Sequence, residues 1–465
     1  MSLSRHLQTL SIPTLGLLLL SADTVTSQEP PATLTKEFFR GRRQALMELV
    51  KQGTEEGRRS VIVLRGGTQG PEMAPFYQDH DFWYLSGVAE EDVAMILLPE
   101  EGKEILLVPP FNRFTATWNG KRLAPGERSV AQTGFAEVGN SRQLSQKIAD
   151  LLGSSQGRPL VWTFLRPQPA RTSTPSAASG AASRRSRDRL DGRPTREKAF
   201  QDALEEKFPE IEIKDVTPFI GELRAVKTTE EIASIKAATE IACEGIAEAM
   251  KSVEPGVYEY QLQAAARYVF TRMGAGEDAY AAIVGSGPNG CVLHYNANRK
   301  RTEAGELVVM DYAPTVNGYT SDVTRTFPVS GKFTKEQRKL VQDVHDVQKE
   351  LIDRVKPGAR LSQLGALCGK LLRAKGYSSD HGPCHHVGLA VHDKQGDILE
   401  PGMLITVEPG AYLRDKGMGC RIEDVVLVTE DGCVKLSGHL PSKPEEIERL
   451  MAKDGLQSRS FGLGR

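Results

Sequence analysis

The chain has 465 residues, of which 39% are hydrophobic and 26% charged, as in ordinary soluble globular proteins, and this length is enough for two domains. Its 59 Lys and Arg residues nearly balance its 60 Asp and Glu residues, for a net charge of −1, which gives no reason to expect nucleic-acid binding or electrostatic docking on a membrane. The six cysteines form no CxxC pair and none precedes Cys243, which argues against a zinc knuckle or a disulfide scaffold.

The first 31 residues resemble a secretory leader. A largely apolar run ends in Leu17–Leu20, and a polar stretch with small residues follows it. The run contains Pro13 and is short for a bilayer span, and no later segment is apolar for long enough, so we do not expect an integral membrane protein. We expect a periplasmic or secreted protein if 1–31 is a signal peptide, and otherwise a cytoplasmic one whose leader has no export role.

An α/β domain is predicted next, over 32–170. Lys36–Gln52 has a helical pattern, and the apolar runs at 60–64, 94–98 and 105–108 are typical of buried strands. The following segment, 171–195, is rich in Ser, Ala, Thr, Pro and Arg, so we expect a flexible surface insertion and no folded element. Residues 196–220 complete this domain and link it to the next one.

The C-terminal part, 221–450, contains an internal repeat, and 451–465 form a tail. Pro255-Gly256, Leu262 and Gly274 recur as Pro357-Gly358, Leu364 and Gly376, each 102 residues further on. In both copies a helix, a Pro-Gly break and a second helix precede apolar strands. A two-fold repeat places equivalent strand ends near one central point.

Four acids lie at the ends of those predicted strands: Asp311, Asp322, Glu408 and Glu423. Asp311 and Glu408 each follow four apolar or β-branched residues, and turn-rich stretches separate the members of each pair, which predicts two hairpins with one acid on each strand. Buried carboxylates close together repel one another. Arg325 and Arg421 are the nearest cations, but two bridging divalent metal ions are a simpler compensation.

Histidines complete this set. Of nine in the chain, His381, His385, His386 and His392 fall within twelve residues, and His294 lies upstream. Mixed carboxylate and imidazole ligands favour Mn²⁺, Co²⁺ or Zn²⁺ over Ca²⁺. Singly, each such His or acid is more often a surface or satisfied core residue, and it is their combination that predicts a metal site.

Four motifs of this region resemble the metallopeptidase family of aminopeptidase P and prolidase. They are 310–327 around Asp311 and Asp322, 381–393 from His381 to Asp393, 406–410 around Glu408, and 421–424 around Glu423. The resemblance covers about residues 220 to 450 in order. It implies an α/β (α+β) architecture, in which a creatinase-like N-terminal domain precedes a pseudo-symmetric "pita-bread" catalytic domain.

The resemblance also implies roles for individual residues. The metal ligands would be Asp311, Asp322, His385, Glu408 and Glu423, binding two divalent ions, with Mn²⁺ favoured. His294, His392 and Glu408 would be catalytic, with Glu408 moving a proton during attack by a metal-bridging hydroxide. His381, Arg421 and Asp81 are assigned to the substrate site, and Arg421 is also expected to support the ligands. Cys384 beside His385 could suggest a thiol nucleophile, but a metal-bound His385 could not act as its base.

Two stretches of the front domain, Asp79–Gly87 and Trp118–Leu123, are similar to aminopeptidase P and favour it over prolidase. The predicted activity is therefore removal of the N-terminal residue from peptides with proline in second position. The alternatives are an Xaa-Pro dipeptidase and, in another class, a non-catalytic peptide-binding module. The five intact ligands argue against such a module and against creatinase-like metal-free hydrolases. Members of this family often form dimers or tetramers, so a homodimer or homotetramer is expected.

Overall fold

A computed structural model describes residues 34–68, 75–153, 158–169, 175–378, 380–393 and 396–456. The leader expected at 1–31 lies outside the described residues, as does 457–465 of the tail. None of the described helices combines the length and the apolar character that a membrane crossing requires. The export prediction therefore stays a prediction.

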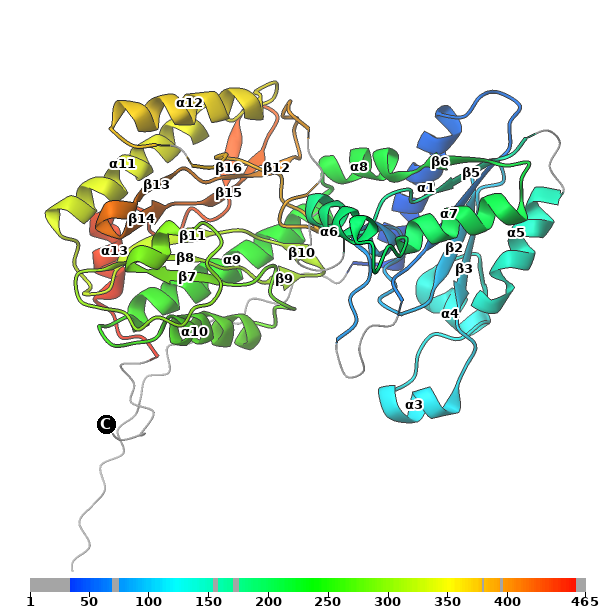
Figure 1. The fold of residues 1–465 in the computed structure, drawn as a ribbon, viewed down its shortest axis with the longest axis horizontal. Helices are drawn as coiled ribbons and strands as arrows, with labels where there is room; N and C mark the ends of the chain where they lie inside the picture. The colour runs from blue at the N-terminus through cyan, green and yellow to red at the C-terminus, as the bar shows by residue number, and fades with distance from the viewer. Residues whose placement is uncertain are drawn as a thin grey trace, which may run out of the picture. The chain divides into compact units, whose positions relative to one another are not determined.

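A six-stranded mixed sheet forms the centre of the N-terminal domain, with strand order β4-β3-β2-β1-β5-β6 (Figure 1). The predicted strands are present as β1 (Ser60–Arg65), β2 (Ala94–Leu98) and β3 (Lys103–Val108). The sequence analysis missed β4 (Glu137–Asn140), β5 (Leu160–Thr163) and β6 (Glu212–Asp215), because each is only four residues long. Strands β1, β2 and β3 are antiparallel neighbours, whereas β4, β5 and β6 join in parallel.

Helices pack on this sheet. The predicted helix Lys36–Gln52 is α1; Thr35 caps it by accepting a hydrogen bond from the amide of Phe38, and Leu46 and Val50 are buried. The other helices of this part are α2 (His80–Ser86), α3 (Arg113–Asn119), α4 (Glu127–Thr133), η1 (Ser141–Gln143), α5 (Leu144–Gly153), α7 (Arg196–Lys207) and α8 (Thr217–Ala225).

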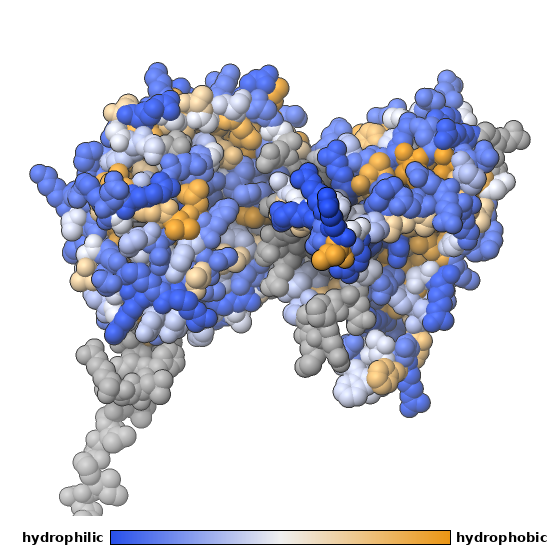
Figure 2. Space-filling model, viewed as in Figure 1, coloured by the Kyte–Doolittle hydropathy of each residue, from blue (hydrophilic) through white to orange (hydrophobic). Residues whose placement is uncertain are grey.

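The expectation that 171–195 contains no folded element is wrong for Pro175–Arg187, which form helix α6. Ala and Arg have high helix propensity, and Arg184, Arg185 and Arg187 lie in the last turn, where they interact favourably with the helix dipole. None of the residues 176–187 is buried, and the surface over α6 is strongly hydrophilic in Figure 2. The segment therefore folds locally without contributing to the core.

The C-terminal domain contains two similar halves (Figure 1). The first comprises α9 (Thr229–Ser252), α10 (Glu259–Arg272), β7 (Ile283–Ser286), η2 (Gly287–Cys291), β8 (Leu307–Asp311), β9 (Thr315–Val316), β10 (Tyr319–Thr320) and β11 (Thr324–Pro328). The second comprises α11 (Lys335–Ile352), α12 (Leu361–Ala374), β12 (Leu404–Val407), β13 (Gly410–Leu413), η3 (Arg414–Lys416), β14 (Met418–Arg421), β15 (Asp424–Val428), β16 (Cys433–Lys435) and α13 (Pro444–Met451). In both halves a helix pair precedes an antiparallel strand pair, β8 with β11 and β12 with β15.

Glycine conformations support the repeat. Gly256 and Gly358, after the first helix of each half, have φ values of 100° and 81°. Gly274 and Gly376, after the second helix, have φ values of 78° and 88°. Residues with a side chain rarely adopt this left-handed backbone conformation, so glycine is needed at all four turns. The spacing of 102 residues therefore corresponds to equivalent backbone turns in two structural copies.

Candidate metal centre

The four acids lie at the ends of the paired strands. Asp311 ends β8, Glu408 directly follows β12, Glu423 directly precedes β15, and Asp322 lies between β10 and β11. The prediction of one acid on each hairpin strand is therefore wrong for three of them. The strand registers explain why they still converge: Val407 pairs with Asp424, which places Glu408 and Glu423 beyond the last pair of the same ladder.

The two halves join at Thr324 and Glu423. The amide of Glu423 donates to the carbonyl of Thr324 at 3.1 Å, and the Thr324 hydroxyl donates to Glu423 Oε2 at 2.6 Å. Thr324 is also the register partner of Asp311 in the first half. One residue of β11 thus positions an acid from each half, and the sequence analysis did not identify it.

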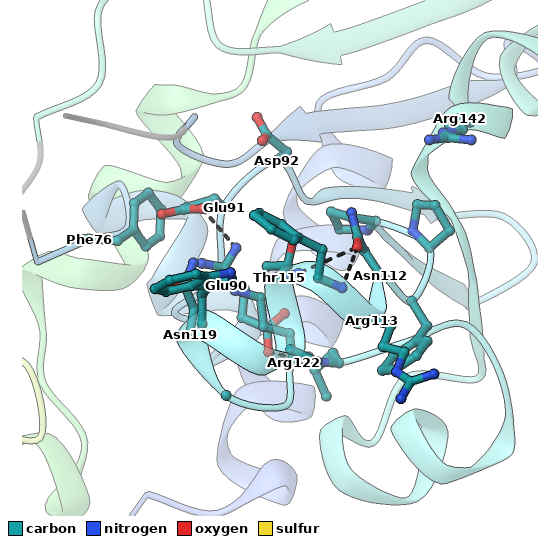
Figure 3. A pocket seen from close by; sticks show the side chains of 18 of the residues that line it. Phe76, Glu90, Glu91, Asp92, Asn112, Arg113, Thr115, Asn119, Arg122 and Arg142 are labelled. Carbon is teal, nitrogen blue, oxygen red and sulfur yellow. Dashed lines mark hydrogen bonds and ion pairs between the residues drawn. The ribbon is translucent and has the colours of Figure 1, made fainter. Parts of the chain in front are cut away.

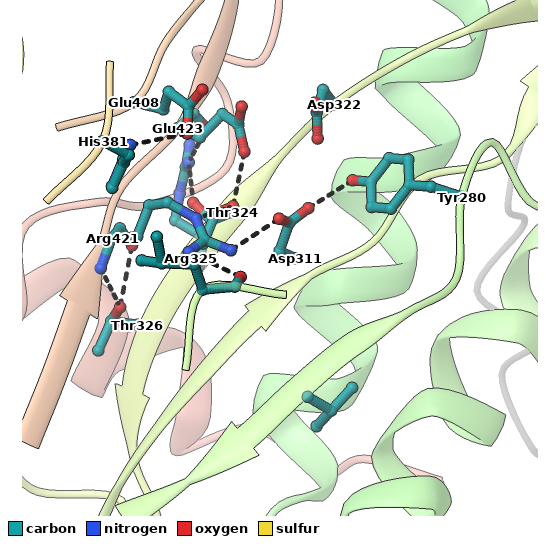
Figure 4. A network of polar contacts seen from close by, with 12 residues as sticks. Tyr280, Asp311, Asp322, Thr324, Arg325, Thr326, His381, Glu408, Arg421 and Glu423 are labelled. Carbon is teal, nitrogen blue, oxygen red and sulfur yellow. Dashed lines mark hydrogen bonds and ion pairs between the residues drawn. The ribbon is translucent and has the colours of Figure 1, made fainter. Parts of the chain in front are cut away.

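A compact ligand set results. Ligand atoms of Asp322, His385 and Glu423 all lie within 4.8 Å of one another. His385 Nε2 lies 3.4 Å from Asp322 Oδ2, 3.4 Å from Glu408 Oε1 and 3.9 Å from Glu423 Oε1. Figure 4 shows Asp311 in the same network. The structure therefore brings together the five side chains that the sequence predicted as ligands.

Burial makes this arrangement electrostatically costly without cations. Burial, and then the charge of Asp311, raises the pKa of Asp322 well above its ordinary value. Burial and Asp322 raise the pKa of Glu423 in the same way, and burial and Glu423 raise that of Glu408. Within the described part of the chain, no Lys or Arg lies within ion-pair distance of these three carboxylates. Their protonated forms are favoured until a cation binds.

Two carboxylate oxygens are particularly informative. Asp322 Oδ1 and Glu423 Oε1 are buried, and neither has a hydrogen-bond partner among the described residues. Buried polar atoms are nearly always paired, and buried charges are paired or coordinate metals. The side chains thus fit divalent cations, which would occupy the space that these two oxygens face.

His385 has the tautomer that a ligand needs. Its Nδ1 lies 3.1 Å from the carbonyl oxygen of His386, which can only accept, so Nδ1 carries the proton and Nε2 presents a lone pair to the acids. Burial lowers the pKa of His385 to about 4, which keeps the ring neutral.

Asp311 is held from both sides by residues of different elements. Tyr280 donates its hydroxyl to Asp311 Oδ1 at 2.5 Å, and Arg421 Nη2 donates to Asp311 Oδ2 at 2.7 Å (Figure 4). The supporting role predicted for Arg421 fits this contact. Tyr280 was not predicted, since it lies in an irregular segment without a motif. Arg325, considered as a partner for the acids, instead pairs with Asp424 at 2.6 Å.

The predicted catalytic histidines lie beside this centre. The rings of His392 and His385 have centroids 4.1 Å apart, and burial lowers the pKa of His392 to about 4. His294 is exposed, but its charge contributes to the lowered pKa values of His392 and His381, so it lies within electrostatic range of both. His392 thus lies against the ligand His385, and His294 lies within electrostatic range of His392 and His381.

Two substrate-binding assignments require correction. Asp81 is 0% exposed, and its Oδ1 lies 2.6 Å from Arg224 Nη1 in a buried ion pair, so it has no surface for a substrate. Arg421 is buried as well, and its guanidinium binds Asp311 and the Tyr412 hydroxyl. His381 is partly exposed: its Nε2 lies 2.9 Å from the Tyr412 hydroxyl and its Nδ1 3.6 Å from Glu408 Oε2. Of the three, only His381 keeps a position open to substrate.

The second N-terminal motif lines a different cavity. A cavity of about 1480 Å³ is bordered by α3 and its flanking loops, including Phe114, Trp118 and Arg122 (Figure 3). Arg122 pairs with Glu91 at 2.8 Å. None of the acids of the metal centre lines this cavity, so it does not belong to the metal centre.

The fold and the site define a hydrolase class, that of two-domain metallopeptidases with a carboxylate-rich centre. Residues 233–430 match the family model described as "Metallopeptidase family M24", and residues 39–162 match "Aminopeptidase P, N-terminal domain". The chain is 31% identical to the Xaa-Pro aminopeptidase of Escherichia coli K12, over 90% of this chain and 98% of that protein. It belongs to metallopeptidase family M24 and is a metal-dependent exopeptidase.

Solved structures agree with this assignment. A structure described as a putative aminopeptidase P from Bacillus anthracis matches with a TM-score of 0.80 and 27% identity, over 91% of this chain and 100% of that one. Zinc-substituted E. coli aminopeptidase P in complex with product matches with a TM-score of 0.74 and 28% identity, over 90% and 99%. These matches confirm the predicted fold class, including the N-terminal domain before the catalytic one.

Proposed function

We propose that this protein removes the N-terminal residue from peptides whose second residue is proline. The observation that carries the proposal is the buried cluster of Asp322, His385 and Glu423, in which two carboxylate oxygens have no donor within the described part of the chain. The N-terminal domain, matched as that of aminopeptidase P, supports an aminopeptidase over a dipeptidase.

Two divalent cations held by the five ligands would supply an activated water and polarise the carbonyl of the scissile bond. We propose Mn²⁺ as the native ion, with Co²⁺ and Zn²⁺ as alternatives, because carboxylates outnumber imidazoles in the ligand set.

Glu408 is proposed to move the proton. Its side chain is 14% exposed, and it lies between His385 Nε2 and His381 Nδ1, at 3.4 Å and 3.6 Å. From this position its carboxylate can accept a proton and then deliver it to the leaving proline nitrogen. That nitrogen requires a proton in order to leave as an amine, because an unprotonated amide anion is a poor leaving group.

His392 and His294 are proposed to bind the substrate carbonyl and backbone. The lowered pKa of His392 keeps its ring neutral, so that it presents one N–H donor and one acceptor. A donor aimed at the developing oxyanion stabilises the transition state more than the ground state. His381, fixed by the Tyr412 hydroxyl, would contact the peptide at the rim of the site.

A peptidase assay tests this function. The purified protein, stripped with a chelator and then supplied with Mn²⁺, should release Xaa from Xaa-Pro-Yaa peptides such as those beginning Arg-Pro-Pro, and should leave matched Xaa-Ala-Yaa peptides largely intact. Preferential cleavage of Xaa-Pro dipeptides would favour the dipeptidase instead. Binding of the peptide without turnover at any metal tested would favour a non-catalytic module.

A homo-oligomer is also proposed. Helix α3 has no buried residue, and Phe114 and Trp118 on it are 72% and 74% exposed, with ring centroids 6.0 Å apart. Exposed aromatic residues of this kind are enriched at protein interfaces. The molar mass from light scattering should exceed that of one chain, and replacing Trp118 by Ser should lower it.

A further inference from the structure

Glu259 is a buried carboxylate that contacts neither the metal ligands nor the substrate histidines directly. It is the first residue of α10 and 0% exposed. Five hydrogen-bond donors surround it: the amide and hydroxyl of Ser286 and the side chain of Asn289 bond to Oε1, and the Tyr295 hydroxyl and the Lys300 amide bond to Oε2. Their distances range from 2.7 Å for the Ser286 amide to 3.1 Å for Asn289.

The ordinary role of an acid at this position is to cap its own helix. The donors to Glu259 come instead from a segment 27 to 41 residues further along the chain. The Glu259 amide also donates to the Lys300 carbonyl at 3.0 Å, so this residue binds both main-chain groups of Lys300. Because both oxygens of Glu259 accept hydrogen bonds from residues 286–300, this carboxylate holds the segment in place.

This segment carries His294 near its middle. Its N-terminal flank is bound to Glu259 through Ser286 and Asn289, and its C-terminal flank through Tyr295 and Lys300. His294 itself is exposed, so packing around its own side chain does little to fix its position. The carboxylate is therefore the common point through which both flanks of the histidine are held.

We propose that Glu259 is a positioning residue for His294, holding the 286–300 segment so that the imidazole stays at the substrate site. This inference rests on the proposed function, in which His294 contacts the substrate. A displacement of about 1 Å at such a group can cost roughly a hundredfold in rate, even when the change is made away from the reacting atoms.

The substitution Glu259→Gln tests this role with little change in shape. Whichever way the amide lies, its NH₂ faces one set of donors, so one flank of His294 loses its acceptor. We expect kcat/KM on an Xaa-Pro-Yaa peptide to fall by about a hundredfold, mostly in kcat, with metal content unchanged. In a His294→Ala background the same substitution should change kcat/KM by less than about twofold, because the group that it positions is already absent.

Glu231→Gln is the matched control. Glu231 is also a buried acid near a helix N-terminus, and it accepts from the Tyr319 hydroxyl at 2.7 Å and the Thr228 amide at 2.8 Å, not from the 286–300 segment. Its effect on kcat/KM should be the same in the wild-type and His294→Ala backgrounds. If the effects of Glu259→Gln and His294→Ala simply multiply, or if His294→Ala leaves the rate unchanged, the positioning role is overturned.

Hydrogen exchange separates this inference from the proposed function. Amides between 287 and 299 should exchange at least about tenfold faster in Glu259→Gln than in the wild type, and should be unaffected in Glu231→Gln. Absence of Xaa-Pro hydrolysis by the metal-loaded wild-type protein would refute the proposed function. Unchanged exchange in Glu259→Gln would refute the inference whether or not the protein is active.

Discussion

Replacing Asp322 by Asn should have opposite effects on stability with and without metal. In the metal-free protein Asp322 is 4% exposed, and no residue that the structure describes donates to its Oδ1 or to Oε1 of Glu423 nearby. An asparagine of the same shape carries no charge at any pH and brings an N–H₂ donor to the cluster. Leaving a buried polar atom unsatisfied costs about 1–3 kcal/mol, so we expect the metal-free variant to be more stable than the metal-free wild type by about that amount.

The pH dependence has a definite sign. The pKa of Asp322 is higher in the folded protein than in the unfolded chain, so protonation of this group stabilises the fold. This stabilisation is fully present below the pKa that Asp322 has in the unfolded chain, and it is lost as pH rises through the pKa that it has in the folded protein. The advantage of the variant should therefore be largest at pH 8 and disappear near pH 4. Metal reverses the order, because at 1,000 times Kd it stabilises the wild type by about 4.1 kcal/mol, more than the advantage of the variant, which has lost a ligand.

Denaturant unfolding at pH 8, with chelator and with Mn²⁺, measures both effects, and titration calorimetry confirms the loss of metal binding. Asp424→Asn is the control, because this neighbouring acid is also buried but is bound by Arg325 and Ser437, both at 2.6 Å. It should lose about 3–5 kcal/mol in both conditions, since Arg325 becomes an unpaired buried charge. A metal-free Asp322→Asn variant that is less stable than the wild type at pH 8, or that metal stabilises equally, would refute the reasoning.

Three further substitutions have defined outcomes. Tyr280→Phe removes the donor to Asp311 and should weaken metal affinity about 10–100-fold in calorimetry; unchanged affinity would exclude a supporting role for Tyr280. Gly388→Ala should cost about 2–4 kcal/mol in denaturant unfolding, because its Cβ would lie 1.7 Å from Asp393 Oδ2, on a side chain held by Arg224; a neutral result would mean that this contact relaxes freely. Arg224→Met should cost about 3–5 kcal/mol by the same assay, because it removes the guanidinium that pairs with two buried carboxylates, Asp81 and Asp393; a variant as stable as the wild type would contradict this.

The ligands could be predicted because their signal is local. Asp311 and Glu408 directly follow runs of apolar or β-branched residues, Asp322 and Glu423 come after the turn-rich stretches that follow them, and His385 lies in a dense histidine cluster, so neighbouring residues in the chain indicate burial and chemistry together. Likewise, α1 and the strands β1 to β3 have strong periodic patterns, and the matched glycines of the two halves occupy turns where a left-handed backbone is required. The pattern of neighbouring residues in the sequence is therefore sufficient to predict these features.

The supporting residues could not be predicted in this way. Tyr280 reaches Asp311 across 31 residues, and Arg224 joins Asp81 and Asp393 across 143 and 169 residues. Such contacts depend on how separate elements pack, and no pattern near any of these residues indicates the partner. The wrong assignment of Asp81 has the same cause, since an acid within a motif was expected to face substrate, whereas tertiary packing buries it against Arg224.

Glu423 and Asp424 show why burial alone does not distinguish a ligand from a structural acid. They are consecutive, and both are at most 1% exposed. Arg325 keeps the pKa of Asp424 below its usual value despite burial, whereas burial and Asp322 raise that of Glu423. Asp424 has its charge compensated by Arg325, whereas Glu423 has an oxygen for which the described residues provide no donor. Only Glu423 therefore has a buried negative charge that a cation can compensate, and this charge is the physical basis for placing metal between the two halves of the domain.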